Sequence, residues 1–142
     1  MPPPLVASLV RRLHLHIRKQ VFDDLVAAGH GDLTAAHMYV LQTPGPDGLR
    51  PTDLAAQTNM TKQAMNHLLS GLERGGYLER VPAQTDGRSK VLRATARGRE
   101  VEQIMLTSAE RIEAEWSAAV GKQQLEQLRE TLRAIDELVA GQ

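Results

Sequence analysis

One stretch of the sequence combines hydrogen-bonding and cationic side chains with a complete lack of acids. Between residues 62 and 70 it reads KQAMNHLLS. At about 100° of rotation per helical residue, the apolar side chains share one face: Met65, Leu68, Leu69 and Leu72. The opposite face collects Gln63, Asn66, His67, Ser70 and Arg74, with Lys62 at its flank. Amides can pair with adenine edges and lysine with guanine or phosphate, so this face suits base recognition. The alternative is an ordinary solvated helix face, which usually carries more Glu and Lys.

The residues before this face have the spacing of a helix-turn-helix. Ala55 is small enough for two helices to cross, and Asn59, four residues later, tolerates a left-handed φ. Met65 is the apolar residue six positions further on. The Thr61 hydroxyl can cap the second helix by accepting a bond from a free first-turn N–H. The pattern predicts two short helices, over residues 51–57 and 61–74, with a joint at 58–60.

A hairpin is predicted directly after the second helix. Residues 77–83 and 90–93 have an extended pattern, and Asp86, Gly87 and Arg88 form the polar tip between them. Arginine is well suited to enter a narrow minor groove, where the negative potential is enhanced. Gly87 would make the turn and Asp86 would hold the cation extended, with Lys90 and Arg93 following. A plain surface hairpin could carry the same residues, but one placed behind a helix-turn-helix favours DNA contact.

The rest of the chain is predicted to be helical. An apolar stripe recurs every four residues from Leu5 to Leu25, a further short helix is capped by Thr34, and two long helices follow Thr95 and Gly98. The fold class is therefore mainly α with a small β-hairpin wing. Long apolar stripes at both ends exceed what a small middle domain can cover, which favours a homodimer. We expect residues 1–32 and 99–142 to form a helical dimerisation domain around a winged helix-turn-helix domain at 33–98.

Charge and composition narrow the classes of protein. The net charge is zero, but residues 50–99 carry nine Lys/Arg against four Asp/Glu, and residues 100–142 carry four against nine. Phosphates respond to such a local field and not to the total. The chain has no cysteine, which excludes disulfides, thiol redox sensing and thiolate metal sites. No export signal or membrane span is visible, so we expect a soluble, cytoplasmic protein.

Over nearly its full length, the sequence resembles the MarR (multiple antibiotic resistance regulator) family of winged-helix repressors. The residues that carry the resemblance are Leu54-Ala55, Thr61 with the helix to Leu72-Glu73, Gly76-Tyr77-Leu78, the tip Asp86-Gly87-Arg88-Ser89, and Ala94-Thr95 with Gly98. One departure is Ala94, where the family usually has Leu.

The resemblance implies a function and a set of contacts. It implies an obligate dimer whose end helices form the dimer domain, acting as a sequence-specific transcription regulator on a near-palindromic operator. Position by position, it implies that Arg88 enters the minor groove with Asp86 supporting it. The major groove would be faced by Lys62, Gln63, Asn66, His67 and Ser70. Thr61, Arg74 and Lys90 complete the candidate DNA-binding residues.

The resemblance also implies a repressor that a small lipophilic compound or aromatic acid releases from DNA. Candidate lining residues of such an effector pocket are His14, Ile17, His37, Met38 and Tyr39. The alternative is that these side chains serve helix packing or lie at the surface. No cofactor is expected. The five histidines leave zinc open, but no i, i+4 pair of ligands is evident, so we predict no metal site.

Two other classes of protein remain as alternatives. A winged helix that binds a protein partner instead of DNA would fit the neutral net charge, but it leaves the acid-free face and the Arg88 tip unexplained. A small enzyme is disfavoured because the sequence has no phosphate-binding glycine motif, nucleophile elbow or metal-ligand spacing. We therefore expect no catalytic residue.

Overall fold

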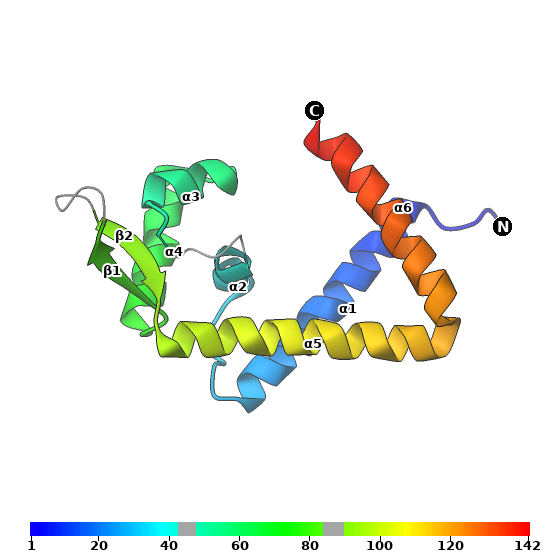
Figure 1. Cartoon of the computed structure of the whole chain (residues 1–142), viewed down its shortest axis with the longest axis horizontal. Coiled ribbons are helices and arrows are strands. Elements are labelled where there is room, and N and C mark those ends of the chain that lie inside the picture. Colours follow the sequence, from blue (N-terminus) through cyan, green and yellow to red (C-terminus); the bar gives the residue numbers. More distant parts are fainter. Residues whose placement is uncertain (43–47, 84–89) are drawn as a thin grey trace. The chain divides into compact units, whose positions relative to one another are not determined.

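The computed structural model describes residues 1–42, 48–83 and 90–142 (Figure 1). Its elements follow in the order α1 (Val6–Ala27), α2 (Ala35–Gln42), α3 (Pro51–Gln57), α4 (Lys62–Arg74), β1 (Leu78–Pro82), β2 (Lys90–Ala94), α5 (Ala96–Val120) and α6 (Lys122–Ala140). The predicted fold class, mainly α with a hairpin wing, is confirmed. The predicted wing tip, including Asp86 and Arg88, lies outside the described residues.

The helix-turn-helix has the local geometry that its residue types predict. Asn59 adopts a φ of 54°, the left-handed conformation expected of it. The Met60 N–H donates to the Ala55 carbonyl across the turn at 3.0 Å. Ala55 and Met65 are both buried, and Thr61 caps α4 by accepting a hydrogen bond from the Ala64 N–H at 3.1 Å. The short turn therefore holds α4 at a defined angle to α3.

Helix α2 begins with a reciprocal cap in which a histidine takes the place usual for Glu or Gln. The Thr34 hydroxyl accepts a bond from the His37 N–H at 3.3 Å, and His37 Nδ1 accepts one from the Thr34 N–H at 3.1 Å. Two free backbone donors are satisfied together, as in a capping box. The predicted role of Thr34 as a cap is confirmed, and His37 has a structural task.

Strands β1 and β2 form an antiparallel pair that runs from Leu78 opposite Ala94 to Pro82 opposite Lys90. Glu79 and Arg93 are ion-paired across the strands at 2.6 Å. Leu49 adds a single bridge to Leu92, which ties the segment before α3 to the hairpin. Ala94, the departure from the family pattern, is buried and paired in register.

The core of the winged-helix part is aliphatic, as the low aromatic content predicts. Leu54, Leu69, Leu72 and Leu92 are fully buried, and Tyr77 is the aromatic residue of this core. These side chains come from α3, α4, the α4–β1 junction and β2. One apolar cluster thus anchors the helix-turn-helix and the hairpin together.

The chain divides into two compact units, Met1–Leu106 and Thr107–Gln142, with the boundary inside α5. In the second unit Arg129 of α6 donates to both carboxylate oxygens of Glu113, at 3.2 and 2.7 Å, which fastens α6 to the end of α5. Helix α6 has no buried residue. The predicted division into 1–32 with 99–142 and 33–98 remains a prediction. In the described ranges, none of the helices is long and apolar enough to cross a membrane.

Candidate nucleic-acid interface

Helix α4 separates its side chains into an inner and an outer face, as its sequence pattern predicts. Met65, Leu69 and Leu72 are fully buried, and Leu68 is partly buried against the core. On the other side Lys62, Gln63, Asn66, His67 and Arg74 are exposed, whereas Ser70 is half-buried. The outer face therefore presents two cations and several amide or imidazole groups to solvent, and residues 62–70 contain no acid.

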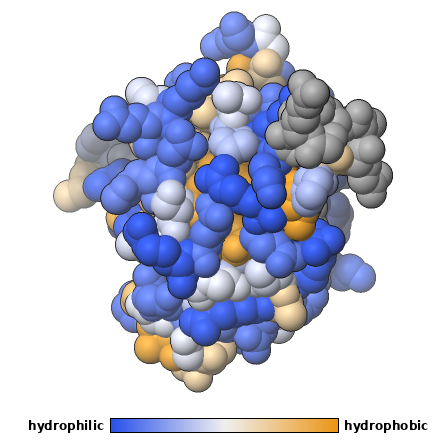
Figure 2. Space-filling view, turned by 90° about the vertical axis from the view of Figure 1, so that its left-hand side faces the viewer, coloured by the Kyte–Doolittle hydropathy of each residue, from blue (hydrophilic) through white to orange (hydrophobic). Residues whose placement is uncertain are grey.

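The hairpin side of the winged helix is strongly hydrophilic. Figure 2 looks onto this side, and hydrophobic residues show mainly in recesses between polar ones. Lys90, at the start of β2, is exposed. A surface of this kind suits contact with a charged and hydrated partner better than a dry apolar interface.

Close packing between α4 and α2 depends on a glycine that the sequence reasoning did not single out. A Cβ on Gly71 would lie 3.1 Å from Nε2 of His37. Burial lowers the pKa of His37, and this effect outweighs the opposing influence of the Asp32 charge. His37, predicted as an effector contact, thus supports α4 from α2 as a neutral imidazole.

The base of the hairpin is tied to the end of α4 by short-range contacts. The Thr95 hydroxyl donates to the Gly76 carbonyl and accepts from the Gly98 N–H, while the Thr95 N–H donates to the Tyr77 carbonyl. A Cβ on Gly98 would lie 2.2 Å from the Tyr77 oxygen, so only glycine fits. Glu73 of α4 and Arg80 of β1 are ion-paired at 2.8 Å. These contacts fix where the wing begins relative to the outer face of α4.

A cavity of about 390 Å³ lies between α1 and α2. Of the predicted effector residues, His14, Ile17, Met38 and Tyr39 line it, whereas His37 is outside the lining. Its lining also includes Arg18, Gln42 and Met60, which the sequence reasoning missed. Met60 directly precedes the cap of α4, so the cavity reaches the turn of the helix-turn-helix. The apolar periodicity of α1 identified Ile17 but not Arg18, because Arg18 lies beside the apolar stripe and not on it.

The histidines do not form a metal site in the described part of the chain, where no group of three or more His, Cys, Asp or Glu side chains could hold an ion. His37 is engaged in the cap of α2, and His30 belongs to a buried polar cluster with Tyr77 and Glu100.

The fold and the outer face of α4 define a winged helix-turn-helix protein. Residues 31–89 match the model of the MarR family. No curated protein sequence matches the chain. Over these residues, which run from the loop before α2 through the helix-turn-helix and β1, the chain is similar to the MarR family.

Several solved structures have a fold similar to that of this chain. Streptococcus pneumoniae FabT in complex with DNA has a TM-score of 0.72 at 18% identity, over 95% of this chain and 98% of that one. The Staphylococcus aureus MepR–DNA complex has a TM-score of 0.70 at 20% identity, over 95% and 98%. CouR from Rhodococcus jostii RHA1, bound to p-coumaroyl-CoA, has a TM-score of 0.65 at 22% identity, over 92% and 90%.

Proposed function

We propose that this protein is a homodimeric, sequence-specific DNA-binding transcription regulator of the cytoplasm, and not an enzyme. The observation that carries the proposal is the outer face of α4. It presents Lys62, Gln63, Asn66 and His67 on a helix that a buried face and a left-handed turn at Asn59 hold in place. The match of residues 31–89 to the MarR family model, and the DNA complexes among proteins of similar fold, support the same function.

Each exposed residue of α4 has a role that follows from its chemistry. Asn66 and Gln63 are suited to adenine edges in the major groove, and Lys62 to guanine or phosphate. Arg88 is proposed to enter the minor groove with support from Asp86, on the ground of the hairpin sequence. Thr61, His67, Ser70, Arg74 and Lys90 complete the proposed contact set.

A dimer is supported by apolar side chains that the single chain leaves in solvent. On α1, Val6 and Val10 are exposed, as is the preceding Leu5, and on α6 so are Leu132, Leu138 and Val139. Burying such stripes against a second copy would remove them from water. Two α4 helices about 34–36 Å apart, one DNA turn, would then read a near-palindromic operator. Occupying a promoter in this way would block polymerase, which makes the protein a repressor.

The cavity between α1 and α2 supports release of the repressor by a small ligand. Its apolar wall of Ile17, Met38 and Met60 suits a lipophilic or aromatic body, and Arg18 suits a carboxylate. CouR, a structural neighbour, is bound to p-coumaroyl-CoA. A ligand between α1 and α2 would contact Met60, one residue before the cap of α4, and could thereby change the position of α4.

Selection of bound duplexes from a random pool, followed by fluorescence anisotropy, tests the proposed function. The full-length protein is expected to enrich a two-fold-symmetric site and to lose affinity steeply between 50 and 200 mM salt, by about 10³-fold or more for six or more phosphate contacts. A dimer in sedimentation that enriches no duplex would instead indicate a winged helix that binds another protein.

A further inference from the structure

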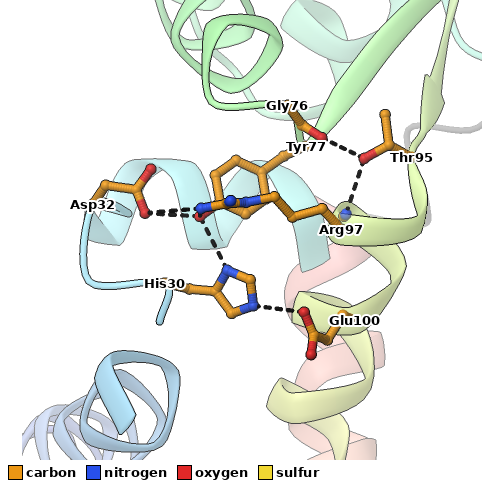
Figure 3. Close-up of polar contacts among 8 residues, drawn as sticks. His30, Asp32, Gly76, Tyr77, Thr95, Arg97 and Glu100 are labelled. Atoms are coloured by element: carbon orange, nitrogen blue, oxygen red, sulfur yellow. Dashed lines mark hydrogen bonds and ion pairs between the residues drawn. The ribbon is translucent and has the colours of Figure 1, made fainter. Parts of the chain in front are cut away.

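The hydroxyl of Tyr77 is the meeting point of three segments that are distant in the sequence (Figure 3). It donates to Oδ1 of Asp32, in the loop between α1 and α2, at 2.7 Å. It accepts from Nη2 of Arg97, in the first turn of α5, at 2.9 Å. Nδ1 of His30, from the same loop as Asp32, lies 3.1 Å away. Since Tyr77 itself lies between α4 and β1, one polar group links the chain before α2, the end of α4 and the beginning of α5.

The tyrosine is buried, whereas its two charged partners reach it from the surface. Tyr77 is 1% exposed, but the side chains of Asp32 and Arg97 are 53% and 45% exposed. The Arg97 guanidinium also covers the Tyr77 ring, at 4.6 Å from its centroid. Water can hydrate both charges when the hydroxyl is removed, so these bonds are not needed to satisfy a buried charge. Their effect is to hold surface side chains of two segments at one fixed point.

Through Asp32, the hydroxyl fixes the place where α2 begins. Only Leu33, which is buried, separates Asp32 from Thr34, the cap of α2. His37, in the first turn of α2, then lies against Gly71 in α4, where an added Cβ would be 3.1 Å from its Nε2. A helix is rigid over so short a distance, so a displacement at Asp32 is passed through α2 to α4.

The backbone of Tyr77 is bonded to the end of α4 and to the residue before α5. Its N–H donates to the Leu72 carbonyl at 2.9 Å, and its carbonyl accepts from the Thr95 N–H at 3.1 Å. The ring lies directly against the end of α4, because a Cβ on Gly75, the C-cap of that helix, would be 2.9 Å from it. Tyr77 is therefore fixed to α4 at its backbone and to the α1–α2 loop at its hydroxyl.

We propose that Tyr77 is a positioning residue for the recognition of DNA sequence, whose hydroxyl sets the angle of α4 by joining the α1–α2 loop to the end of that helix. The inference rests on the proposed function, in which the outer face of α4 binds base edges. Hydrogen bonds to base edges need a fixed geometry, whereas flexible cations reach phosphates from a wider range of positions. A less firmly held α4 has to be ordered on the operator, which costs specific affinity and leaves non-specific binding unchanged.

The test compares the affinity of the full-length protein for two duplexes by fluorescence anisotropy: the operator selected from the random pool, and a shuffled duplex of the same length and composition. Tyr77→Phe keeps the ring and removes only the hydroxyl. It is expected to bind the operator about fivefold more weakly, a usual size for residues that act without touching the ligand. Its affinity for the shuffled duplex should not change. A role in stability alone would not separate the two duplexes, because a smaller folded fraction lowers both affinities equally.

A pair of variants at Asp32 keeps the test decisive even if Tyr77→Phe does not fold. Asp32→Ala removes the acceptor of the tyrosine hydroxyl, whereas Asp32→Asn keeps an acceptor oxygen in its place. Both remove one negative charge, so a general gain in attraction to DNA is the same in the two and cancels. Asp32→Ala should bind the operator about fivefold more weakly than Asp32→Asn. Equal operator affinities of the two variants would overturn the proposal.

Combining the two changes tests whether Tyr77 and Asp32 act through one contact. The double variant Tyr77→Phe, Asp32→Ala should bind the operator no more weakly than Asp32→Ala alone, because the bond that the second change would remove is already absent. Losses that multiply, to about 25-fold, would show that the two residues act independently, and the proposal would then be wrong.

The proposed function and the positioning role of Tyr77 fail in different ways. If the unchanged protein enriches no duplex and binds neither of the two, the proposed function is refuted and the positioning role with it. If the unchanged protein prefers its operator and Tyr77→Phe has the same preference, the proposed function stands and the positioning role alone is refuted. An equal loss of affinity for both duplexes also refutes the positioning role, because it reports a general loss of binding.

Discussion

The apolar faces of the winged-helix segment and of the end helices differ in how far they are buried within the single chain. In the first, Leu54, Leu69 and Leu72 are fully buried within the single chain. On α6, a comparable stripe that includes Leu128, Leu132 and Leu138 stays exposed, although its periodicity is equally regular. An amphipathic pattern therefore shows that a face will be buried, but not by what. The winged-helix segment buries its apolar face within one chain, whereas the exposed faces of the end helices are the ones that we propose a second copy covers.

The largest effect is expected from a cavity opened in the buried core of the winged-helix segment. Leu69→Ala should lower the free energy of unfolding by about 2–5 kcal/mol, since a fully buried leucine loses both transfer energy and packing. Urea unfolding followed by circular dichroism measures the loss. Leu106→Ala, at a leucine that is 53% exposed, is the matched control and should cost far less. Equal costs would mean that burial in the single chain does not distinguish the two regions.

The dependence of the end helices on a partner is tested at Leu138, which is 67% exposed. Leu138→Asp should turn the dimer into a monomer and weaken operator binding about 100-fold, because each half-site is then bound alone. Its own unfolding should change little. Sedimentation velocity and anisotropy measure these effects, with Asp136→Ala on the same exposed helix as the control. A Leu138→Asp protein that stays dimeric would place the interface elsewhere.

Within the winged-helix segment, the outer face of α4 is expected to determine the preference for particular DNA sequences. Asn66→Ala should cost about 1–3 kcal/mol at particular base pairs and little at others, since the amide pairs with a base edge. Binding to a panel of single-base operator variants measures this, and Gln124→Ala on α6 serves as the control. A uniform loss over the whole panel would assign Asn66 to the DNA backbone.

The smallest effect is expected from the wing. Arg88→Ala should weaken binding about equally across operator sequences and reduce the slope of log affinity against log salt by about 1, because it removes one cation. Anisotropy over a salt series measures the slope, and Arg88→Lys should keep most of it. An unchanged slope would remove Arg88 from the contact set.

Much of the local structure of the winged-helix segment could be predicted from short-range sequence patterns. The left-handed turn at Asn59, the cap at Thr61 and the inner face of α4 each depend on residues a few positions apart, and all three are confirmed. The sequence pattern did not predict the roles of two residues. His37 was considered for a ligand pocket but caps α2 beneath Gly71, and Arg18 lines the cavity although it lies off the apolar stripe of α1.

By itself the amino-acid sequence determined which faces are polar, where the helices begin and where the chain turns, because these depend on periodicity and on local hydrogen bonds. Only the tertiary structure decided that His30, Tyr77 and Glu100 meet, since they lie 47 and 70 residues apart along the chain from His30. Contacts over such separations are set by how the core packs, and no spacing rule records them.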